Sequence, residues 1–457
     1  MALAHTHKAN PHWLKPNPLA AIAAIPGEEG WPIVGNTFRV LADPAGFGKR
    51  MAATYGPVYR NRAFGARHVA LLGPEANELV LFNRDQTFSS EQGWGPMLNL
   101  LFPRGLMLMD GDTHRADRRT LSVAFKPEPM RHYADVLNAG IARAVAGWAD
   151  RPMRFYDTIK ALSLELAAEA FLGMPLGPEE DRINQAFVDE VQASIAPVRV
   201  PLPGTAMGRG VKARAYLVEL FKREIPARRG GEGKDFFSQF FRARDDAGEP
   251  LSDDAIADHM NFLMMAAHDT ITSSATSLVL LLGRNPAWQA RLREEVAELG
   301  LNDDEGVPYA MLDRLVLTEY CFKEALRMVP PVPSLPRRAL RAFEFGGYHI
   351  PAGTEVGINV RHTHYMPEHW PEPDRFDPMR FAPEAVRARH KYAWVPFGGG
   401  AHMCLGLHFA VMQVRILIAH IVRRYTIEVH GGEFDQWQFW PIPRPRDGLP
   451  LTFVPVA

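Results

Sequence analysis

A single cysteine in a glycine-rich loop constrains this chain more than any other feature of its sequence. Cys404 lies in the run Phe397-Gly-Gly-Gly-Ala-His-Met-Cys-Leu-Gly406, and an apolar segment that predicts a helix follows over residues 405–424. Glycines let the backbone approach the sulfur closely, and the amide end of a helix favours a thiolate. With no second cysteine nearby, this thiolate cannot complete an all-cysteine zinc or iron–sulfur site, but it can serve as the single axial ligand of a haem iron.

Composition and charge exclude several classes of protein. The 457 residues include 47% hydrophobic and 23% charged residues, which is ordinary for a globular protein. The formal net charge of −1 gives no overall electrostatic attraction to nucleic acid or to acidic membranes. Two cysteines, Cys321 and Cys404, cannot form a disulfide framework and favour a reducing cytoplasm. The apolar run over residues 19–25 is far shorter than a membrane span of about 20 residues. We therefore expect a cytoplasmic protein with no membrane anchor and no nucleic-acid partner.

Hydrophobic periodicity predicts a mainly helical chain with small β-sheets, an α+β fold. A helix is expected near 43–55, a β-hairpin over 58–72, mostly helices over 111–328 and further strands over 339–359. Residues 1–25 are interpreted as a poorly ordered lead-in. Length alone suggests about three domains, but the motifs assigned below to one site span most of the chain, so we expect residues 26–457 to form a single domain.

The cysteine loop resembles the haem-binding signature of the cytochrome P450 family, F-x-x-G-x-[R/H]-x-C-x-G. The matching positions are Phe397, Gly400, His402, Cys404 and Gly406. Most members carry arginine where His402 stands. The resemblance extends over residues 26–456 and implies the P450 fold around one heme b, with Cys404 as the iron ligand. The alternatives are a glycine turn around an inert buried cysteine and, less well, a nucleotide loop, which lacks its third glycine at Met403.

A carboxylate and a guanidinium precede the loop at helical spacing. Glu324 and Arg327 are three residues apart, where their side chains can meet. Most such pairs are solvated surface pairs, but this one precedes two prolines and lies 80 residues before Cys404, as the E-x-x-R pair of the family does. The resemblance implies a buried structural triad, completed by Arg375 from Pro373-Asp-Arg-Phe376, that holds the core beneath the haem.

A long apolar helical run over 253–282 contains the sequence Ala266-Ala-His-Asp-Thr270. Leu263, Ala266, Ala267 and Thr270 share one helix face by their spacing. The segment resembles the family pattern [A/G]-G-x-[D/E]-T-[T/S], from which it departs at Ala267 and Ile271. The resemblance implies catalytic roles for Thr270, which would hold a water, and for Asp269, the acid that links it to solvent. The alternative is a threonine bonded to its own helix and an aspartate in a surface pair.

The resemblance also assigns the residues around the haem propionates. His114 and Arg118 match an H-x-x-x-R pattern, Arg337 precedes a β-run, and His402 adds a fourth donor. Together with Phe397, Cys404 and Gly406 these residues are expected to bind the cofactor. Basic residues nearby, Arg115, Arg119 and Lys126, could form a docking face for an acidic redox protein.

An apolar pocket wall is expected above the haem, and it predicts a small apolar substrate. We first expect a steroid, terpenoid or similar lipid, with a fatty acid or an aromatic hydrocarbon as alternatives. The residues assigned to the wall are Trp94, Met97, Leu100, Leu101, Leu263, Ala266, Ala267, Val332 and Leu335.

The resemblance implies a monooxygenase that inserts one oxygen atom of O2 into a C–H bond. No flavin or nicotinamide domain fits into the remaining chain, so electrons are expected from a ferredoxin and an NAD(P)H-dependent ferredoxin reductase. The alternatives are a peroxide-driven or rearranging haem-thiolate enzyme and a non-catalytic haem sensor or carrier. A zinc hydrolase is disfavoured because the chain contains no H-E-x-x-H, and His362, His364 and His369 lie in an irregular proline-rich region.

Overall fold

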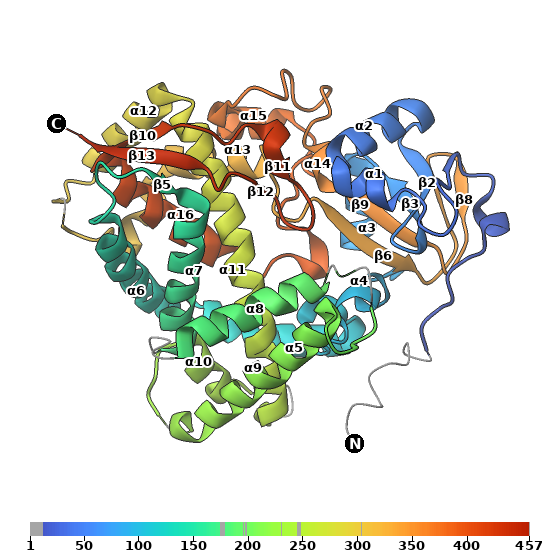
Figure 1. Cartoon of the computed structure of the whole chain (residues 1–457), viewed down its shortest axis with the longest axis horizontal. Coiled ribbons are helices and arrows are strands. Elements are labelled where there is room, and N and C mark those ends of the chain that lie inside the picture. Colours follow the sequence, from blue (N-terminus) through green and yellow to red (C-terminus); the bar gives the residue numbers. More distant parts are fainter. Residues whose placement is uncertain are drawn as a thin grey trace.

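The computed structural model describes residues 12–173, 179–194, 196, 199–229, 231–244, 248–302 and 304–456. A helix-rich part carries most of the described chain, and a smaller part built around a β-sheet lies at the right of Figure 1. The predicted α+β class is therefore confirmed. Of the lead-in, residues 12–25 contact this sheet part: Trp13 Nε1 donates to Glu91 at 2.8 Å, and Asn17 Nδ2 donates to Thr354 at 2.9 Å.

The main sheet joins residues 27–89 to residues 334–359, two segments far apart in the sequence. Its strand order is β1-β2-β3-β9-β6-β4, with β2 and β3 forming the expected hairpin, turned at Phe64 and Gly65, which both have positive φ. The parallel pairing of β3 with β9 places residues 68–71 beside residues 355–358. The strands are β1 Gly27–Glu28, β2 Val58–Ala63, β3 Ala66–Leu71, β4 Phe88–Ser89, β6 Ser334–Ala339 and β9 Glu355–Asn359.

Helices account for the rest of the framework. Those near the sheet are α1 Thr37–Ala42, α2 Pro44–Tyr55, α3 Pro74–Phe82, α4 Glu91–Leu98 and α14 Val360–Thr363, whereas α15 Pro383–Ala388 contacts the 3₁₀ turn Pro378–Phe381. The helical part contains α5 Gly111–Leu121, α6 Pro127–Val145, α7 Phe155–Leu172, α8 Glu180–Ser194, α9 Ala206–Arg228, α10 Phe236–Arg242, α11 Asp253–Gly283, α12 Pro286–Ala297, α13 Val316–Met328 and α16 Leu407–Val422. Three small sheets pair β10 Tyr425–Val429 with β13 Pro450–Pro455 and β5 Met153–Arg154, β7 Phe343–Phe345 with β8 Tyr348–Ile350, and β11 Trp437–Gln438 with β12 Arg444–Pro445.

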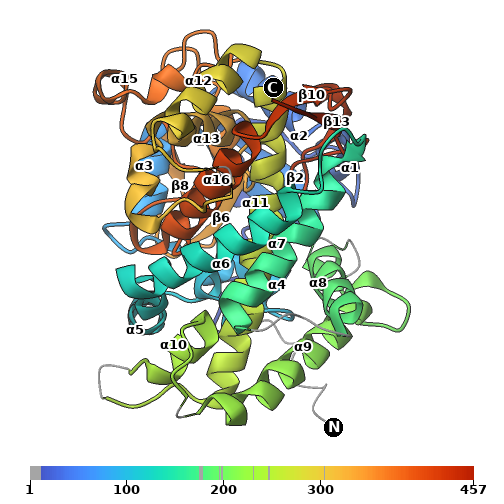
Figure 2. The same ribbon diagram turned by 90° about the vertical axis from the view of Figure 1, so that its left-hand side faces the viewer.

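Helix α11 is the axis of the helical part. It begins at the Ser252 cap, whose side chain accepts a hydrogen bond from the Ala255 amide. From residue 271 to 282 every residue is buried, because α7, α9, α13 and α16 all contact this helix. Figure 2 shows α11 and α16 enclosed by α6, α7 and α12. The predicted central position of the 253–282 segment therefore matches the observed packing.

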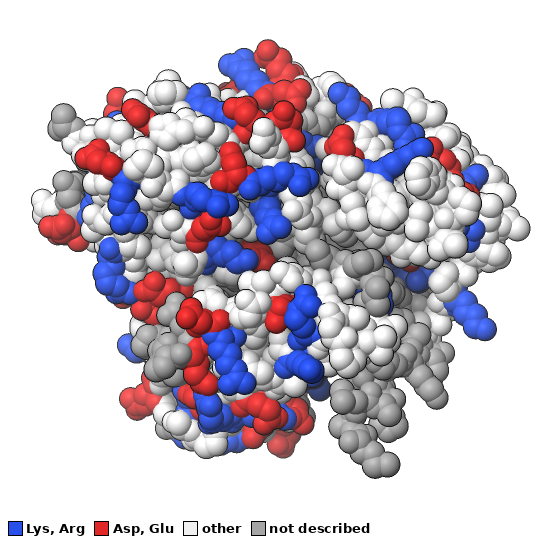
Figure 3. Space-filling model, in the orientation of Figure 1, with Lys and Arg blue, Asp and Glu red and all other residues white. Residues whose placement is uncertain are grey.

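The outer surface carries charges of both signs. On the face shown in Figure 3, lysine and arginine atoms are interspersed with aspartate and glutamate atoms over the helical part, and the chain as a whole has a net charge of −1. Within the described ranges, no helix is both long enough and apolar enough to cross a bilayer.

Candidate active site

The cysteine loop is anchored to α3, at the opposite end of the sequence. Gly400 has φ 61°, and a Cβ there would overlap the carbonyl oxygen of Leu81, so only glycine fits. Gly398 also has a positive φ, and the Cys404 amide donates to the Phe397 carbonyl at 2.9 Å. The turn therefore holds Cys404 just before α16, which begins at Leu407, two residues later than the sequence had predicted.

The sulfur of Cys404 is accessible to a metal ion. Its side chain is exposed, whereas the other cysteine, Cys321, is fully buried in the core. Burial raises the pKa of the Cys404 thiol on balance, although a hydrogen bond from the Gly406 amide and the charge of Arg118 act against that rise. An amide donor and a cation beside the sulfur are features that stabilise a bound thiolate, so the loop fits an iron ligand.

Imidazoles and a guanidinium gather beside the loop. The rings of His114 from α5 and His402 are in contact, with their centroids 4.0 Å apart and their planes tilted by 35°. Burial, with help from His402 and Arg118, lowers the pKa of His114 to about 4, so its ring is neutral at pH 7. Its Nε2 is buried and has no hydrogen-bond partner within the described part of the chain. An orphaned donor of this kind fits a carboxylate such as a haem propionate.

Two further groups complete this polar region. His402 Nε2 lies 3.5 Å from an oxygen of Asp110, a residue that the sequence analysis did not single out. Burial raises the pKa of Asp110, but hydrogen bonds from His402, Ser89 and the Ser90 amide outweigh it, so the net shift is downward. Arg337 on β6 is buried, and among the described residues its side chain donates one hydrogen bond, from Nη1 to the adjacent Pro336 carbonyl at 2.8 Å. Burial lowers the pKa of Arg337 to about 10.

The Glu324–Arg327 pair is fully buried on α13. Arg327 Nε and Nη2 donate to the two carboxylate oxygens of Glu324 at 2.7 and 2.8 Å. Arg327 Nη1 also donates to the His364 carbonyl at 3.0 Å, and the Asp377 amide donates to Glu324 at 3.0 Å. The two charges therefore bind α13 to the irregular segment over 364–381, which is a structural role.

The expected third member of this cluster, Arg375, requires a correction. Its side chain is 62% exposed and pairs with Glu372, and only its backbone carbonyl reaches Arg327. Instead Arg380, which is 11% exposed, places Nε 3.4 Å from Glu324. The sequence contains two successive P-x-R-F runs, and the second, Pro378-Met-Arg-Phe381, is the one that turns inward as a 3₁₀ helix.

Helix α11 opens on one side at the predicted oxygen-binding segment. In a helix that is otherwise buried over most of its length, Leu263, Met265, Ala266, Ala267 and Thr270 are half-buried. By their helical spacing Leu263, Ala266, Ala267 and Thr270 lie on one face of α11, whereas Met265 lies on another. The Thr270 hydroxyl donates to the Ala266 carbonyl at 2.7 Å, the bond foreseen in the alternative interpretation, and its lone pairs remain available as acceptors.

Asp269 turns away from this opening toward α7. Its Oδ1 lies 3.5 Å from Lys160 Nζ and 3.3 Å from His268 Nδ1, and the carboxylate is buried. His268 Nε2 lies 3.2 Å from the Lys160 carbonyl. Lys160 is partly exposed, so its side chain lies between the buried carboxylate of Asp269 and solvent. Lys160 was not foreseen, because its partner lies on another helix.

The predicted wall residues come from three elements. On α4 and the turn after it, Leu101 is fully buried while Trp94, Met97 and Leu100 are partly buried against the same core as Leu263 and Ala267. Val332 and Leu335 are half-buried, and Leu335 lies in β6 and packs against the sheet core. The histidines of the proline-rich region form no metal site, since within the described residues no three metal-ligating side chains come together.

A sequence profile of the cytochrome P450 family matches residues 25–441. This chain is a cytochrome P450. It is 34% identical over 449 residues to the putative cytochrome P450 136 of Mycobacterium tuberculosis, covering 96% of this chain and 90% of that protein. It is 29% identical to abscisic acid 8'-hydroxylase 1 of rice, Oryza sativa, over 94% of this chain and 90% of that protein.

A solved structure agrees with the fold. The retinoic acid-bound cyanobacterial CYP120A1 superposes with a TM-score of 0.86 at 28% identity, covering 97% of this chain and 100% of that one. The P450 family and fold bind haem through a cysteine thiolate, so this chain is a haem-thiolate monooxygenase. When bound, haem supplies the iron centre that activates dioxygen.

Proposed function

We propose that Cys404 holds the haem iron and that the enzyme hydroxylates a terpenoid lipid on the side of the haem that α11 faces. The half-buried stripe that includes Leu263, Ala266, Ala267 and Thr270 carries this proposal, since it is the stretch of α11 that opens inward. Relatives named for abscisic acid and retinoic acid favour a terpenoid over a steroid. The apolar residues around α4 provide a matching wall.

The test is a spectral titration of the haem-loaded enzyme with terpenoids, steroids and fatty acids, followed by turnover. We expect terpenoids to shift the iron from low to high spin and to yield a product one oxygen atom heavier when a ferredoxin, its reductase and NAD(P)H are supplied. Spin shifts without product would indicate a carrier. Product formed with peroxide but not with the redox partners would indicate the peroxide-driven alternative.

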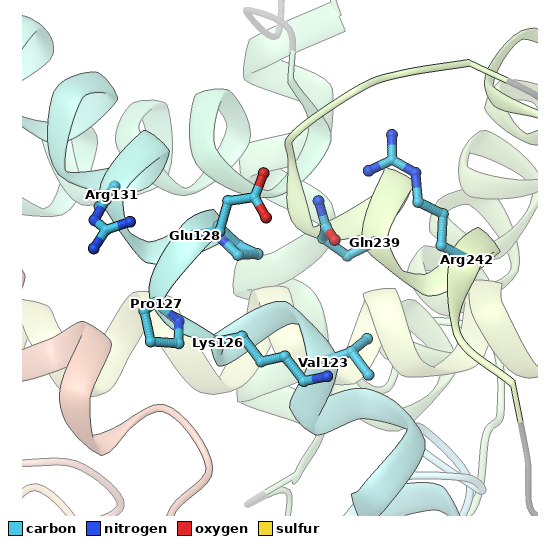
Figure 4. Close-up of a pocket in the computed structure, with 8 residues that line it drawn as sticks. Val123, Lys126, Pro127, Glu128, Arg131, Gln239 and Arg242 are labelled. Atoms are coloured by element: carbon cyan, nitrogen blue, oxygen red, sulfur yellow. The ribbon is translucent and has the colours of Figure 1, made fainter.

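An acidic ferredoxin is proposed as the electron donor because basic residues line two surface hollows, the first of which includes residues of the cysteine loop. The first, of about 410 Å³, is lined by His114, Arg115, Arg118, Arg119, Ser122, Gly400 and Ala401. The second, of about 520 Å³, begins at the next residue, Val123 (Figure 4). In that view Arg131 and Arg242 lie at opposite ends, with Glu128 and Gln239 between them and Lys126 along the rim. Screening by salt should therefore slow reduction by ferredoxin.

Thr270 and Asp269 are proposed to deliver protons to the oxygen side of the site. Lys160 and His268 hold the carboxylate of Asp269 away from the opening, so a rotation of Asp269 could exchange protons between solvent and a water bound by Thr270. His268 is nearly fully buried, and burial lowers its pKa, so it remains neutral at pH 7.

Replacing Thr270 with alanine should uncouple electron consumption from product formation. Without the hydroxyl, protons reach the oxygen in an uncontrolled order, and we expect product per NAD(P)H to fall about tenfold while peroxide rises. The measurement compares NAD(P)H consumed, peroxide released and product formed. The control is Thr276→Val, because Thr276 makes the same bond within α11, to the Thr272 carbonyl at 2.7 Å, but is fully buried. Unchanged coupling in Thr270→Ala would remove Thr270 from the mechanism.

A further inference from the structure

The short helix α4, which carries residues of the predicted wall, is weak by its own sequence. It has eight residues, and Gly93, Gly95 and Pro96 lie inside it. Glycine and proline are the residues least favourable to a helix interior, so α4 depends on neighbouring segments to keep its shape and place. Trp94 and Met97 of the predicted wall are on this helix and pack against the helical core. Whatever holds α4 therefore also fixes this part of the wall.

One segment that holds α4 comes from the N-terminal end of the described chain. The ring of Trp13 fills a notch at Gly95, where a Cβ would lie 2.2 Å from the ring atom Cη2. Trp13 Nε1 also donates to Glu91 at 2.8 Å, one turn earlier on the same face of α4. The adjacent Leu14 amide donates to the Gln92 side chain at 2.9 Å. The indole thus makes both an apolar and a polar contact with the helix.

Strand β6 holds α4 from the other side. A Cβ at Gly93 would lie 2.6 Å from Arg337 Cα, so a larger residue could not approach this strand without a shift. Gly93 and Gly95 are about 200° apart around the helix axis at 3.6 residues per turn. Trp94 lies about 100° from each of them and faces the core. The indole therefore presses α4 against β6 and leaves the side that carries the wall residues toward the core.

The N-terminal segment is fixed to the sheet at its other end. Asn17 Nδ2 donates to Thr354 Oγ1 at 2.9 Å. A Cβ at Gly353, which has φ 83°, would lie 2.9 Å from the Lys15 carbonyl oxygen. Residues 13–17 therefore form an N-terminal strap that runs from the turn before β9 to α4.

We propose that Trp13 is a positioning residue for the substrate site, which holds α4 against β6 and so keeps Trp94 and Met97 in place before a substrate binds. A wall that is already ordered costs less to complete when a ligand packs on it. The proposal rests on the proposed function in one respect, which is that α4 forms a wall of the substrate site. It does not depend on the substrate being a terpenoid.

The test uses two azoles that bind haem iron through the same ring nitrogen, imidazole and 1-octylimidazole. Their dissociation constants for the haem-loaded enzyme are measured from the shift of the Soret band. We expect Trp13→Ala to weaken binding of 1-octylimidazole about tenfold and to change that of imidazole by less than about twofold, because only the octyl chain reaches the wall. Amide hydrogen exchange in α4 should become faster in the same variant.

Two further tryptophan variants serve as controls. Trp13→Phe keeps a ring in the notch at Gly95 and should retain most of the wild-type affinity for 1-octylimidazole. Trp31→Ala removes an indole that is 65% exposed in the same part of the chain. It should change neither azole affinity nor exchange in α4.

Gly95→Ala tests the same contact from the helix. The added methyl overlaps the indole ring, whereas alanine favours a helix more than glycine does. Weaker binding of 1-octylimidazole in this variant would therefore report the displaced ring and not a weaker helix. We expect the double variant Trp13→Ala/Gly95→Ala to bind 1-octylimidazole no more weakly than Trp13→Ala alone, because the two changes remove one shared contact. Gly95→Ala keeps the test decisive should Trp13→Ala fail to fold.

Several results would overturn the positioning role. Unchanged binding of 1-octylimidazole in Trp13→Ala and Gly95→Ala, even with a lower unfolding temperature, would show that the strap only stabilises the fold. Equal weakening of both azoles would place the effect at the haem and not at the wall. Equal affinity of the wild-type enzyme for the two azoles would show that no wall receives the chain. Both azoles bind iron whatever the natural substrate is, so failure of the terpenoid titration would leave these measurements intact.

Discussion

Replacing Cys404 with serine is expected to abolish the characteristic red-displaced Soret band of the reduced, carbon monoxide-bound enzyme. A serine oxygen is a far weaker electron donor to iron than a thiolate, and the electron density that favours O–O cleavage is lost with the sulfur. Hydroxylation should fall by at least about 10³-fold, equivalent to about 4 kcal/mol of activation free energy. The spectrum and the turnover number of purified, haem-supplemented protein provide the measurement.

The chain supplies a matched control in its other cysteine. Cys321 is 0% exposed on α13, and burial raises its thiol pKa well above the ordinary value, so it is an inert core residue. Cys321→Ser should lower the unfolding temperature but leave the Soret band in place. A red-displaced band in Cys404→Ser, or its loss in a folded Cys321→Ser protein, would contradict the assignment.

Replacing Glu324 with alanine is expected to prevent recovery of folded, haem-loaded protein. Arg327 would remain fully buried, with two of its nitrogens deprived of the carboxylate that they now contact at 2.7 and 2.8 Å. Breaking a buried pair in this way costs about 3–5 kcal/mol, a large share of the roughly 5–15 kcal/mol that stabilises a typical protein. Soluble expression, haem content and urea unfolding measure the effect.

Variants of two arginines, Arg375 and Arg380, distinguish the buried structural role of Glu324 from a surface effect. Arg380→Ala removes the guanidinium 3.4 Å from Glu324, so it should lower stability clearly but less than Glu324→Ala. Arg375→Ala should change the free energy of unfolding by no more than about 0.5 kcal/mol, because its side chain is 62% exposed. The reverse order of the two arginine variants would restore the original assignment of Arg375.

Local patterns predicted the parts of the site that one segment supplies by itself. The glycine-framed loop around Cys404 and the contact between Glu324 and Arg327 follow from local backbone geometry, whereas the burial of that pair was implied by the family resemblance. The long apolar run predicted α11 because a helix that is buried on several faces has few polar positions. The two P-x-R-F runs could not be told apart in this way, because both arginines have the same local sequence and only tertiary packing turns Arg380 inward.

Contacts between distant segments account for the site residues that the sequence did not predict. Asp110 reaches His402, and Lys160 reaches Asp269, across more than 100 residues of sequence, a distance that no local pattern covers.

The close packing of Gly400 against the Leu81 carbonyl has a consequence for biosynthesis. During synthesis α3 leaves the ribosome long before the loop that must dock on it, and the pairing of β3 with β9 likewise waits for the later strand. The haem-binding site is therefore complete only when nearly the whole polypeptide has emerged. Colour should develop late in translation, and nascent chains halted before Gly400 should remain colourless.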